Sequence, residues 1–412
     1  MITRTHESKK GIMLTTIGTL LMYLYIFFSY VAQDIVISSR VASLSLYAFI
    51  SFTLLKEIAN LNFARKFSAF SIWYFLFAAF SLLIMSYAPE RNILSGAFYS
   101  IIVTFVVIWA VQTYVIDANA FRSLAWCFAI SGCATFFLLL VTGNLKGSAE
   151  ERLGQEFFGN ANTFAALMMV AALFAVWLIV FSHGFHRFAA IAILAVSLYT
   201  LALSSGRKFF IIPFLFLYIL LLCNHDKKGR THFIRNTIIF LILIWIVWLA
   251  ITKIPVFYNA IGIRMEGFFE TLEGEGGEAS AQIREEMRAL AMEGWKERPL
   301  FGYGLDSFKH YAVTEMGIFA YSHCNYTELL YSGGFIYFIL YYAMFANIIL
   351  RARKKKLLAT PFRAFAIALP ITLFIFDFGA VSYNTPFQLI LLALAYKALS
   401  LKTKEEINNG ID

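Results

Sequence analysis

A histidine and a glutamate stand five residues apart, where a long polar stretch gives way to an apolar run. They are His323 and Glu328, in the segment YSHCNYTE at residues 321–328. If a helix begins here, both side chains lie in its first turns, at the edge of the apolar run. There they can act as general base, hydrogen-bond partner or electrostatic partner of a phosphate. The alternative is a polar side chain that only reaches from an interfacial helix toward water.

Two cations follow a tight turn at residues 204–208, whose sequence is SSGRK. Arg207 and Lys208 stand at the start of the next apolar run, where the free amides of a helix amino terminus add positive potential. Arginine can hold phosphate oxygens at two points and needs no metal ion to do so. The segment therefore predicts a pyrophosphate-binding turn, with a solvated surface turn as the alternative.

The elements that must position these side chains are apolar helices. Of the 412 residues, 60% are hydrophobic and only 14% are charged, against roughly 25% charged residues in a soluble domain. Hydrophobic runs of about 18–22 residues recur along the chain, and each can cross a hydrocarbon core about 30 Å thick. The composition predicts an all-α integral membrane protein and excludes a water-soluble globule. The four cysteines lack disulfide or metal-ligand spacing and are expected to be packing residues.

About twelve transmembrane helices are expected from the hydrophobic runs. They lie near residues 12–32, 41–55, 67–87, 94–116, 123–142, 161–182, 188–204, 209–223, 236–255, 325–350, 362–381 and 384–399. The chain then divides into nine helices with short loops at 1–255, one long loop at 256–324, and three helices with a tail at 325–412. The first run has no small-residue cleavage site, so it is expected to stay in the protein.

Dense basic clusters predict the orientation in the membrane. They lie at the amino terminus and near residues 56–66, 227–235 and 351–356. With a cytoplasmic amino terminus, all of them fall on the cytoplasmic side, in agreement with the positive-inside rule. The long loop, His323 and the turn at 204–208 then share the outer side. The net charge of +9 is therefore interpreted as a topology signal, and nucleic acid is not an expected partner.

Other basic residues remain on the outer side, where this rule disfavours them. They are Arg152, Arg207, Lys208, Arg264, Arg284, Arg288 and Arg298. Cations that persist there favour an anionic ligand. The alternative is a solvated face on which they pair with glutamates of the long loop, namely Glu266, Glu270, Glu285 and Glu297.

The long loop itself contains a predicted hinge, a predicted helix and a turn-rich segment. The hinge is formed by Gly274, Gly276 and Gly277, and a helix is expected from Ser280 to about Arg298. Its apolar stripe at helical spacing either lies on the membrane surface or packs over the bundle, the more usual role. The stripe consists of Ile283, Met287, Leu290 and Ala291. The RPLFGYG segment at 298–304 follows no strand, so its Gly-x-Gly gives little support to dinucleotide binding.

Four segments taken together resemble the bacterial O-antigen ligase and polymerase superfamily. They are RLG at 152–154 with GNAN at 159–162, SGRK at 205–208, RPLFGYG at 298–304, and SHCNYTELL at 322–330 before Gly333 and Gly334. The order and spacing of these segments carry the resemblance, which covers residues 150–350. It implies a GT-C-like membrane fold in which a long periplasmic loop contains short helices.

The resemblance implies a glycosyltransferase that takes a glycan from an undecaprenyl-pyrophosphate carrier at the periplasmic face of the bacterial inner membrane. Its functional residues would fall on Arg207, Arg264 and His323, with Arg284 as a further candidate. The expected catalytic residues are thus His323, Glu328 and Arg264, and the expected pyrophosphate ligands are Arg207, Arg284, Lys208 and Arg152. No cofactor and no metal ion are expected, because the outer loops lack an Asp-x-Asp pair.

Three functions remain open, and polymerisation of O-antigen or capsule repeat units is the preferred one. A polymerase transfers the glycan to a lipid-linked repeat unit, whereas an O-antigen ligase transfers it to lipid A core. A lipid-linked oligosaccharide flippase is the third, although its ionisable groups would be expected deep within the spans. A purely structural scaffold is the alternative to all three. Membrane lipids and a chain-length regulator protein are further expected partners.

Overall fold

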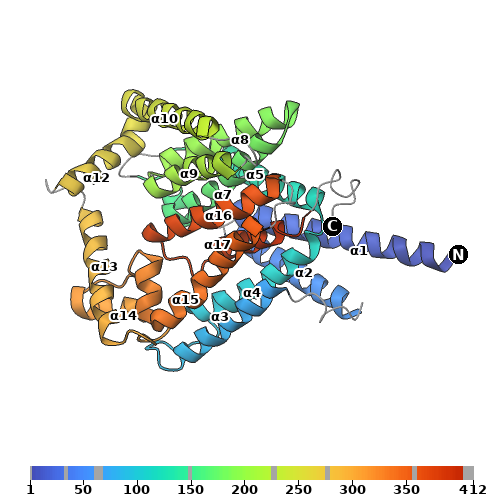
Figure 1. Cartoon of the computed structure of the whole chain (residues 1–412), viewed down its shortest axis with the longest axis horizontal. Coiled ribbons are helices and arrows are strands. Elements are labelled where there is room, and N and C mark those ends of the chain that lie inside the picture. The colour runs from blue at the N-terminus through green and yellow to red at the C-terminus, as the bar shows by residue number, and fades with distance from the viewer. Residues whose placement is uncertain are drawn as a thin grey trace. The chain divides into compact units, whose positions relative to one another are not determined.

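The computed structural model describes residues 2–31, 36–59, 68–146, 151–223, 230–273, 279–354 and 360–401. All regular secondary structure in these ranges is helical, and they contain no strand. Figure 1 shows these helices and the order in which they follow one another. The predicted all-α class is therefore confirmed.

Nine segments of the described helices are long and apolar enough to cross a membrane. They are Met13–Val31, Arg40–Ala59, Gly96–Tyr114, Ala118–Val141, Ala161–Phe181, Gly184–Leu203, Phe233–Lys253, Asn325–Lys354 and Pro361–Gly379. The other three predicted spans are shorter helices: α3 (Ala69–Met85) and α9 (Arg207–Cys223) have 17 residues, and α17 (Pro386–Ala398) has 13. Each predicted span thus coincides with a helix, although three are shorter than the usual length for a full crossing.

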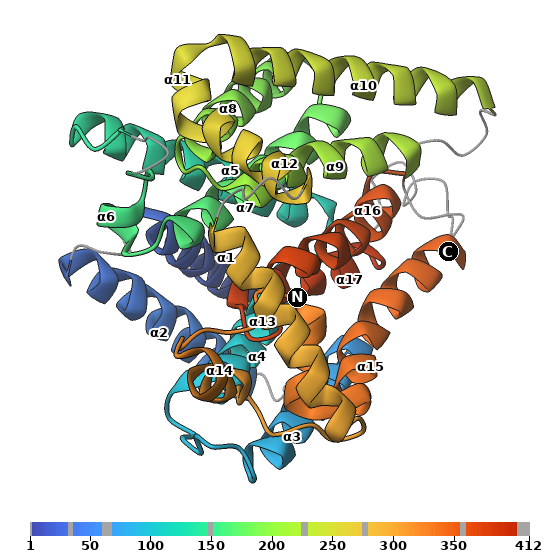
Figure 2. The same cartoon turned by 90° about the vertical axis from the view of Figure 1, so that its left-hand side faces the viewer.

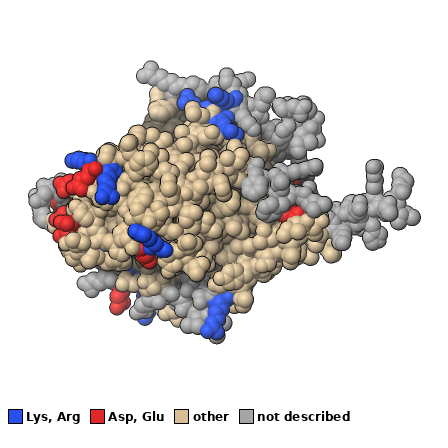
Figure 3. Space-filling model, turned by 90° about the horizontal axis from the view of Figure 1, so that it is seen from below, with Lys and Arg blue, Asp and Glu red and all other residues tan. Residues whose placement is uncertain are grey.

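Large apolar side chains are exposed on many of these helices. On α10 (Arg230–Lys253), Leu241 is 59% and Trp245 is 61% exposed, and Phe75 of α3 is 63% exposed. Figure 3 shows one face on which the charged side chains lie mostly toward the edges of a broad uncharged area. Such a surface would promote aggregation in water and suits a lipid environment. The chain is a multi-pass membrane protein.

The helices form two compact units that alternate along the chain. Unit 1 contains residues 1–66, 110–264 and 401–409, and unit 2 contains residues 67–109, 265–400 and 410–412. Because each unit contains parts that are distant in the sequence, helices that pack together are not always neighbours along the chain. The division into 1–255, 256–324 and 325–412 follows chain order and stays a prediction.

Unit 1 is organised around α7. Its helices are α1 (Ile2–Val31), α2 (Val36–Ala59), α5 (Ala118–Val141), α6 (Gln155–Phe158), α7 (Ala161–Phe181), α8 (Gly184–Leu203), α9, α10, α11 (Pro255–Phe257) and η2 (Tyr258–Gly262). Figure 2 shows α5, α8 and α9 around α7, in agreement with their contacts. A Cβ atom added to Gly132 of α5 would lie 2.4 Å from the Cβ of Ala171 on α7. Small residues therefore allow these helices the close approach that stabilises helix pairs in membranes.

Unit 2 is organised around α15. It contains α3, most of α4 (Gly96–Tyr114), α13 (Ala279–Glu297), α14 (Phe308–Met316), α15 (Asn325–Lys354), α16 (Thr360–Phe376), η3 (Asp377–Gly379) and α17, and α12 (Ile263–Glu273) begins at its boundary with unit 1. The indole of Trp73 on α3 donates a 2.6 Å hydrogen bond to the carbonyl of Leu340 on α15. About two turns further along α3, the Ser81 hydroxyl is 2.8 Å from that of Tyr337 on α15. Polar contacts thus join α3 to a helix distant in sequence.

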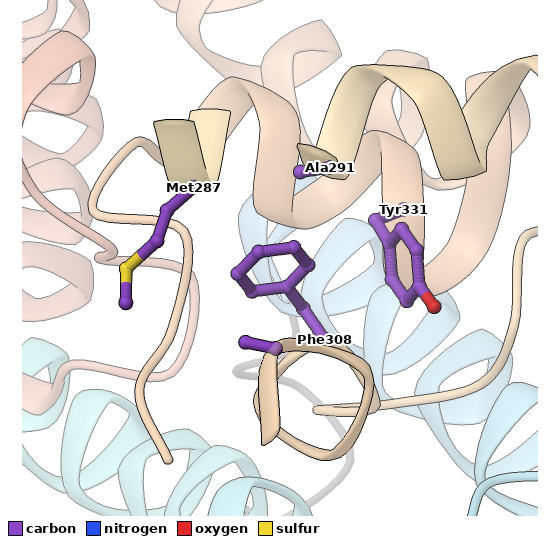
Figure 4. Packing of buried hydrophobic residues seen from close by; sticks show 5 residues of the cluster. Met287, Ala291, Phe308 and Tyr331 are labelled. Carbon is purple, nitrogen blue, oxygen red and sulfur yellow. The ribbon is translucent and has the colours of Figure 1, made fainter. Parts of the chain in front are cut away.

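The amphipathic helix predicted before residue 298 is α13, and its stripe is packed against neighbouring helices. Met287 and Ala291 lie in one buried cluster with Phe308 of α14 and Tyr331 of α15 (Figure 4). Leu290 packs against this cluster, which also contains Ala312, whereas Ile283 is 36% exposed. Packing, one of the two roles predicted for the stripe, is confirmed for its later residues. The predicted hinge glycines, Gly274, Gly276 and Gly277, lie outside the described residues.

Candidate active site

A tight turn joins α8 to α9 and carries the first candidate residues. Ser205 has a φ of 55°, in the left-handed region that residues other than glycine rarely adopt. Its hydroxyl donates a 2.6 Å hydrogen bond to the carbonyl of Ala260 in η2. On the other side, a Cβ atom added to Gly206 would lie 3.2 Å from Ala165. Close contacts thus hold the turn in a strained conformation, as is common at functional sites.

Three arginines meet at this turn. The Nε atom of Arg152 donates a 2.8 Å hydrogen bond to the carbonyl of Ser204. Arg207 donates to the carbonyl of Arg264, and Arg264 donates a 3.4 Å hydrogen bond to the carbonyl of Ser205. All three side chains are partly buried and anchored to backbone carbonyls. Their positive charges are therefore concentrated and oriented at one place.

The segments around Arg152 and Arg207 are also joined to each other. A terminal nitrogen of Arg152 donates a 2.9 Å hydrogen bond to the Asn162 side chain on α7. The Leu153 N–H donates to the Leu203 carbonyl at 3.1 Å. The RLG, GNAN and SGRK segments, which are separated in sequence, thus converge in unit 1. Lys208 lies next to them, with its ammonium 5.0 Å from the ring centre of Phe209.

This arrangement of cations suits a ligand with several phosphate oxygens. A pyrophosphate offers oxygens to more than one guanidinium. Helix α9 begins at Arg207, so its amino-terminal amides add positive potential at the same place. The turn thus brings together guanidinium groups and backbone amides, two kinds of group that bind phosphate oxygens.

His323 lies in unit 2, in the loop that leads into α15. Its φ is 59°, so it too is held in the left-handed region. The residue is partly exposed, and its ring centre is 4.8 Å from that of Tyr321. The buried Ser322 hydroxyl donates a 3.0 Å hydrogen bond to the Cys324 carbonyl, which ties together the residues on either side of His323. The strained loop thus holds the imidazole at the amino end of α15.

Glu328 contacts this loop from the interior of the protein and holds it in place. It is fully buried in the first turn of α15, and its Oε2 atom accepts a 2.8 Å hydrogen bond from the backbone N–H of Ser322. Its Oε1 atom has no hydrogen-bond partner in the described part of the chain. The carboxylate therefore contacts the backbone beside His323 rather than an open space. These contacts favour a positioning role for Glu328 over that of a general base.

Two substitutions of Glu328 are expected to differ in effect. Glu328→Gln should keep most of the turnover, because the amide oxygen still accepts the Ser322 N–H. Glu328→Ala leaves that buried N–H unpaired, which costs about 1–3 kcal/mol, and turnover should fall because His323 is no longer held in place. Rates of the two variants at equal amounts of folded protein test this. A Gln variant as inactive as the Ala variant would instead show that Glu328 must be ionised or transfer a proton.

Arg284 of α13 lies near the His323 loop. Partial burial raises the pKa of Tyr321, and the positive charge of Arg284 opposes that rise. Since the Tyr321 ring contacts His323, the three residues belong to one region of unit 2. The candidate residues thus fall into two groups. Arg152, Arg207, Lys208 and Arg264 are in unit 1, and Arg284, His323 and Glu328 are in unit 2.

The RPLFGYG segment crosses α15 at a kink. Gly334 interrupts the helix with a φ of 68°, and a Cβ atom there would lie 2.2 Å from the carbonyl carbon of Leu300. Gly302 has a φ of 62°, and its Cβ atom would lie 2.4 Å from the carbonyl oxygen of Tyr331. Backbone hydrogen bonds join this segment to α15 where the two cross. Only glycine fits both positions, so two segments of the sequence pattern form one structure.

Asp377 in η3 is a buried carboxylate that was not among the predicted site residues. It accepts a 2.6 Å hydrogen bond from the Ser382 hydroxyl and a 3.2 Å hydrogen bond from the Asn325 amide. Asn325 is the first residue of α15, so this network fixes the helix start two residues after His323. The available signal was that Asp377 is the acidic residue of the predicted span at 362–381, since ionisable residues within spans are functional candidates.

The fold and these contacts define a multi-pass membrane protein with two groups of candidate residues, clustered arginines in unit 1 and a histidine in a strained loop of unit 2. Residues 189–342 match the sequence model of a family described as O-antigen ligase. This match supports the O-antigen ligase and polymerase superfamily and confirms the resemblance seen in the sequence. No curated protein matches the chain.

The matched range contains most of the predicted site residues. It includes Arg207, Arg264, Arg284, His323 and Glu328, whereas Arg152 lies before it. The family supports a ligase or polymerase type of function that acts on lipid-linked glycans. In the described ranges, no three His, Cys, Asp or Glu side chains are grouped so that they could hold a metal ion.

Proposed function

We propose that the chain is a metal-independent glycosyltransferase that polymerises undecaprenyl-pyrophosphate-linked repeat units of O-antigen or capsule. It would act at the periplasmic face of the bacterial inner membrane. The convergence of Arg152, Arg207 and Arg264 on one turn carries the proposal. Such a cluster suits the pyrophosphate of the carrier, because guanidinium groups bind phosphate oxygens at two points.

In the proposed reaction, an acceptor hydroxyl attacks the anomeric carbon of the donor sugar. The new glycosidic bond forms as the bond from that carbon to the pyrophosphate oxygen breaks, with inversion of configuration. Undecaprenyl pyrophosphate leaves with the bonding electrons, and Arg207 and Arg264 stabilise the charge that develops on it. His323 accepts the proton of the attacking hydroxyl. Arg284 and Lys208 contribute further positive charge, and Glu328 positions the His323 loop.

Ligation to lipid A core is the second candidate, because the matching family is described as O-antigen ligase. A ligase would use the same donor and the same leaving group, so the arginine cluster suits both reactions. The two functions differ in the acceptor alone. A measurement that identifies the acceptor is therefore needed to separate them.

Deletion of the gene, followed by electrophoresis of the surface polysaccharide, makes this separation. A single repeat unit attached to lipid A core is expected and means that a polymerase has been lost. Polymer on the lipid carrier together with bare core would instead identify a ligase. Unchanged polysaccharide, combined with absence of turnover by the purified protein in lipid, would overturn both candidates and leave a transporter or scaffold.

The orientation gives a prediction that does not depend on catalysis. A thiol reagent that cannot cross the membrane should label single cysteines introduced at residues 270–280 in intact cells and leave cysteines at 353–356 unlabelled. The reason is the placement of the basic clusters on one side of the membrane. Labelling of both regions after cell lysis is the control for reactivity. Labelling of 353–356 in intact cells would reverse the orientation and remove His323 from the periplasmic side.

A further inference from the structure

A hollow of about 690 Å³ opens in unit 2 between the loop that follows α3 and helix α14. Its volume lies within the range of about 300–1,000 Å³ typical of ligand pockets. The side chains that matter here are four tyrosines and two arginines: Tyr87, Tyr303, Tyr311, Tyr331, Arg91 and Arg298. The hollow is thus lined by aromatic faces and fixed positive charges.

Three of the tyrosines form one stack. The ring of Tyr331 lies parallel to that of Tyr303, with centres 4.9 Å apart, and to that of Tyr311, with centres 5.4 Å apart. A Cβ atom on Gly294 of α13 would lie 2.5 Å from the Tyr331 ring, so the stack rests directly on that helix. Figure 4 shows the Tyr331 hydroxyl directed away from Phe308. The aromatic faces are therefore held in place before a ligand arrives, which lowers the entropy lost on binding.

The two arginines are free of carboxylate partners in the described part of the chain. The guanidinium of Arg298 lies 4.6 Å from the ring centre of Tyr303, and the Nε atom of Arg91 donates to a backbone carbonyl at 3.1 Å. The neighbouring Glu90 is 2.8 Å from the ammonium of Lys309, whose hydrogen bond lowers the pKa of Glu90. Arg91 and Arg298 are the fixed charges among the lining residues, and Glu297 adds a negative charge next to the hollow, where it accepts a hydrogen bond from the Tyr303 hydroxyl.

We propose that this hollow binds an acidic sugar, in the class of uronic acids, within the glycan on which the protein acts. The C–H face of the sugar ring packs on the partly exposed rings of Tyr303 and Tyr311, and the sugar carboxylate pairs with Arg298 and Arg91. This inference rests on the proposed function, which supplies the glycan, and it adds the chemical class of one sugar in that glycan. Tyr331 lies six residues after Asn325, about 9 Å along α15, so the bound sugar is close to the one that reacts beside His323.

Direct binding to the full-length protein in lipid nanodiscs tests the proposal. The probe is a trisaccharide of galacturonic acid, and its carboxyl-reduced, neutral counterpart is the matched control. The acidic trisaccharide should bind at least ten times more tightly, and the difference should shrink at high salt, where charges are screened. Equal affinity for the two sugars would overturn the proposal. Displacement of the trisaccharide by an equal concentration of glycerol 3-phosphate would also overturn it, in favour of a lipid headgroup.

Substitutions locate the binding site. Arg298→Gln and Arg91→Gln are each expected to weaken binding of the acidic trisaccharide about tenfold, or about 1.4 kcal/mol. Lys296→Gln removes the same charge from an exposed residue that does not line the hollow, so its affinity should match the wild type. Arg91 lies in an exposed loop, and its variant tests the proposal if Arg298→Gln fails to fold. Wild-type affinity in a folded arginine variant, or an equal loss in the lysine variant, would overturn it.

Failure of this inference can be distinguished from failure of the proposed function. Binding is measured without turnover, so His323→Ala should still bind the acidic trisaccharide. If His323→Ala is inactive and the wild type binds no acidic sugar, the proposed function stands and the sugar class is wrong. If His323→Ala is fully active and the arginine variants lose binding, the hollow stands and the proposed mechanism is wrong.

Discussion

Replacement of His323 by Ala is expected to reduce polymer formation at least about 100-fold, because a positioned general base contributes about 10²–10⁴ to a rate. The imidazole is partly exposed at the amino end of α15, in a loop braced by Glu328. Turnover of a lipid-linked substrate by purified, lipid-reconstituted protein measures the effect. Full activity of the Ala variant at matched protein level would remove His323 from the site.

Further variants separate the effect of losing the imidazole from the effect of backbone strain at position 323. Since His323 has a φ of 59°, Ala introduces strain there, whereas Gly adopts this conformation freely. His323→Gly should therefore be as inactive as His323→Ala while being closer to the wild type in stability. His323→Gln retains hydrogen bonding without taking up a proton, so partial activity would indicate positioning of the substrate. His183→Ala changes an exposed histidine on the predicted cytoplasmic side and should leave turnover unchanged.

Replacement of Arg207 by Lys should reduce kcat about 10- to 100-fold even though the charge is kept. Loss of one donor that stabilises the charge of a transition state costs about 10²–10³ in rate, and lysine retains part of that stabilisation as a point charge. It loses the planar two-point contact with phosphate oxygens. The lysine side chain also cannot donate to the carbonyl of Arg264 with the geometry of the Arg207 guanidinium. Initial rates at saturating lipid-linked donor measure the change.

Arg187→Lys provides the matched control for this substitution. Arg187 also donates to a backbone carbonyl, that of Ser182, at 2.9 Å near the start of a helix. It lies on the predicted cytoplasmic side, away from the donor pyrophosphate. We expect wild-type turnover in this variant, which shows that loss of an arginine-to-carbonyl contact alone does not reduce activity. The same wild-type turnover in Arg207→Lys would make Arg207 a packing residue.

The sequence predicted the helical class and the spans because hydrophobicity along a helix is a local property. Every predicted span coincides with a helix, and the stripe of α13 packs where its spacing suggested. The four segments that resemble the superfamily were also visible, since each is continuous. Their contacts were not visible. The crossing of Gly302 and Gly334, and the reciprocal contacts of Arg207 and Arg264, depend on how distant parts of the chain fold together.

Three features of the structure had almost no signal in the sequence. The tyrosines of the hollow are scattered from residue 87 to residue 331 of a chain with 21 tyrosines, so nothing in their spacing marks them as a group. The link between Asn325 and Asp377 joins residues 52 positions apart. Backbone strain at Ser205 and His323 was equally hidden, because it follows from surrounding contacts and not from residue type.

The hydrogen bond from Trp73 on α3 to Leu340 on α15 can form only late in the synthesis of the chain. These residues are 267 positions apart in the chain. A ribosome adds about 5–20 residues per second, so α3 waits roughly 15–50 s for its acceptor. During that interval the indole N–H must be satisfied by lipid headgroups, water or the insertion machinery, whereas the Ser81 hydroxyl can donate to the Phe77 carbonyl of its own helix. Unit 2 is therefore assembled late in synthesis, and a nascent chain that ends before Leu340 carries α3 without the acceptor of its Trp73.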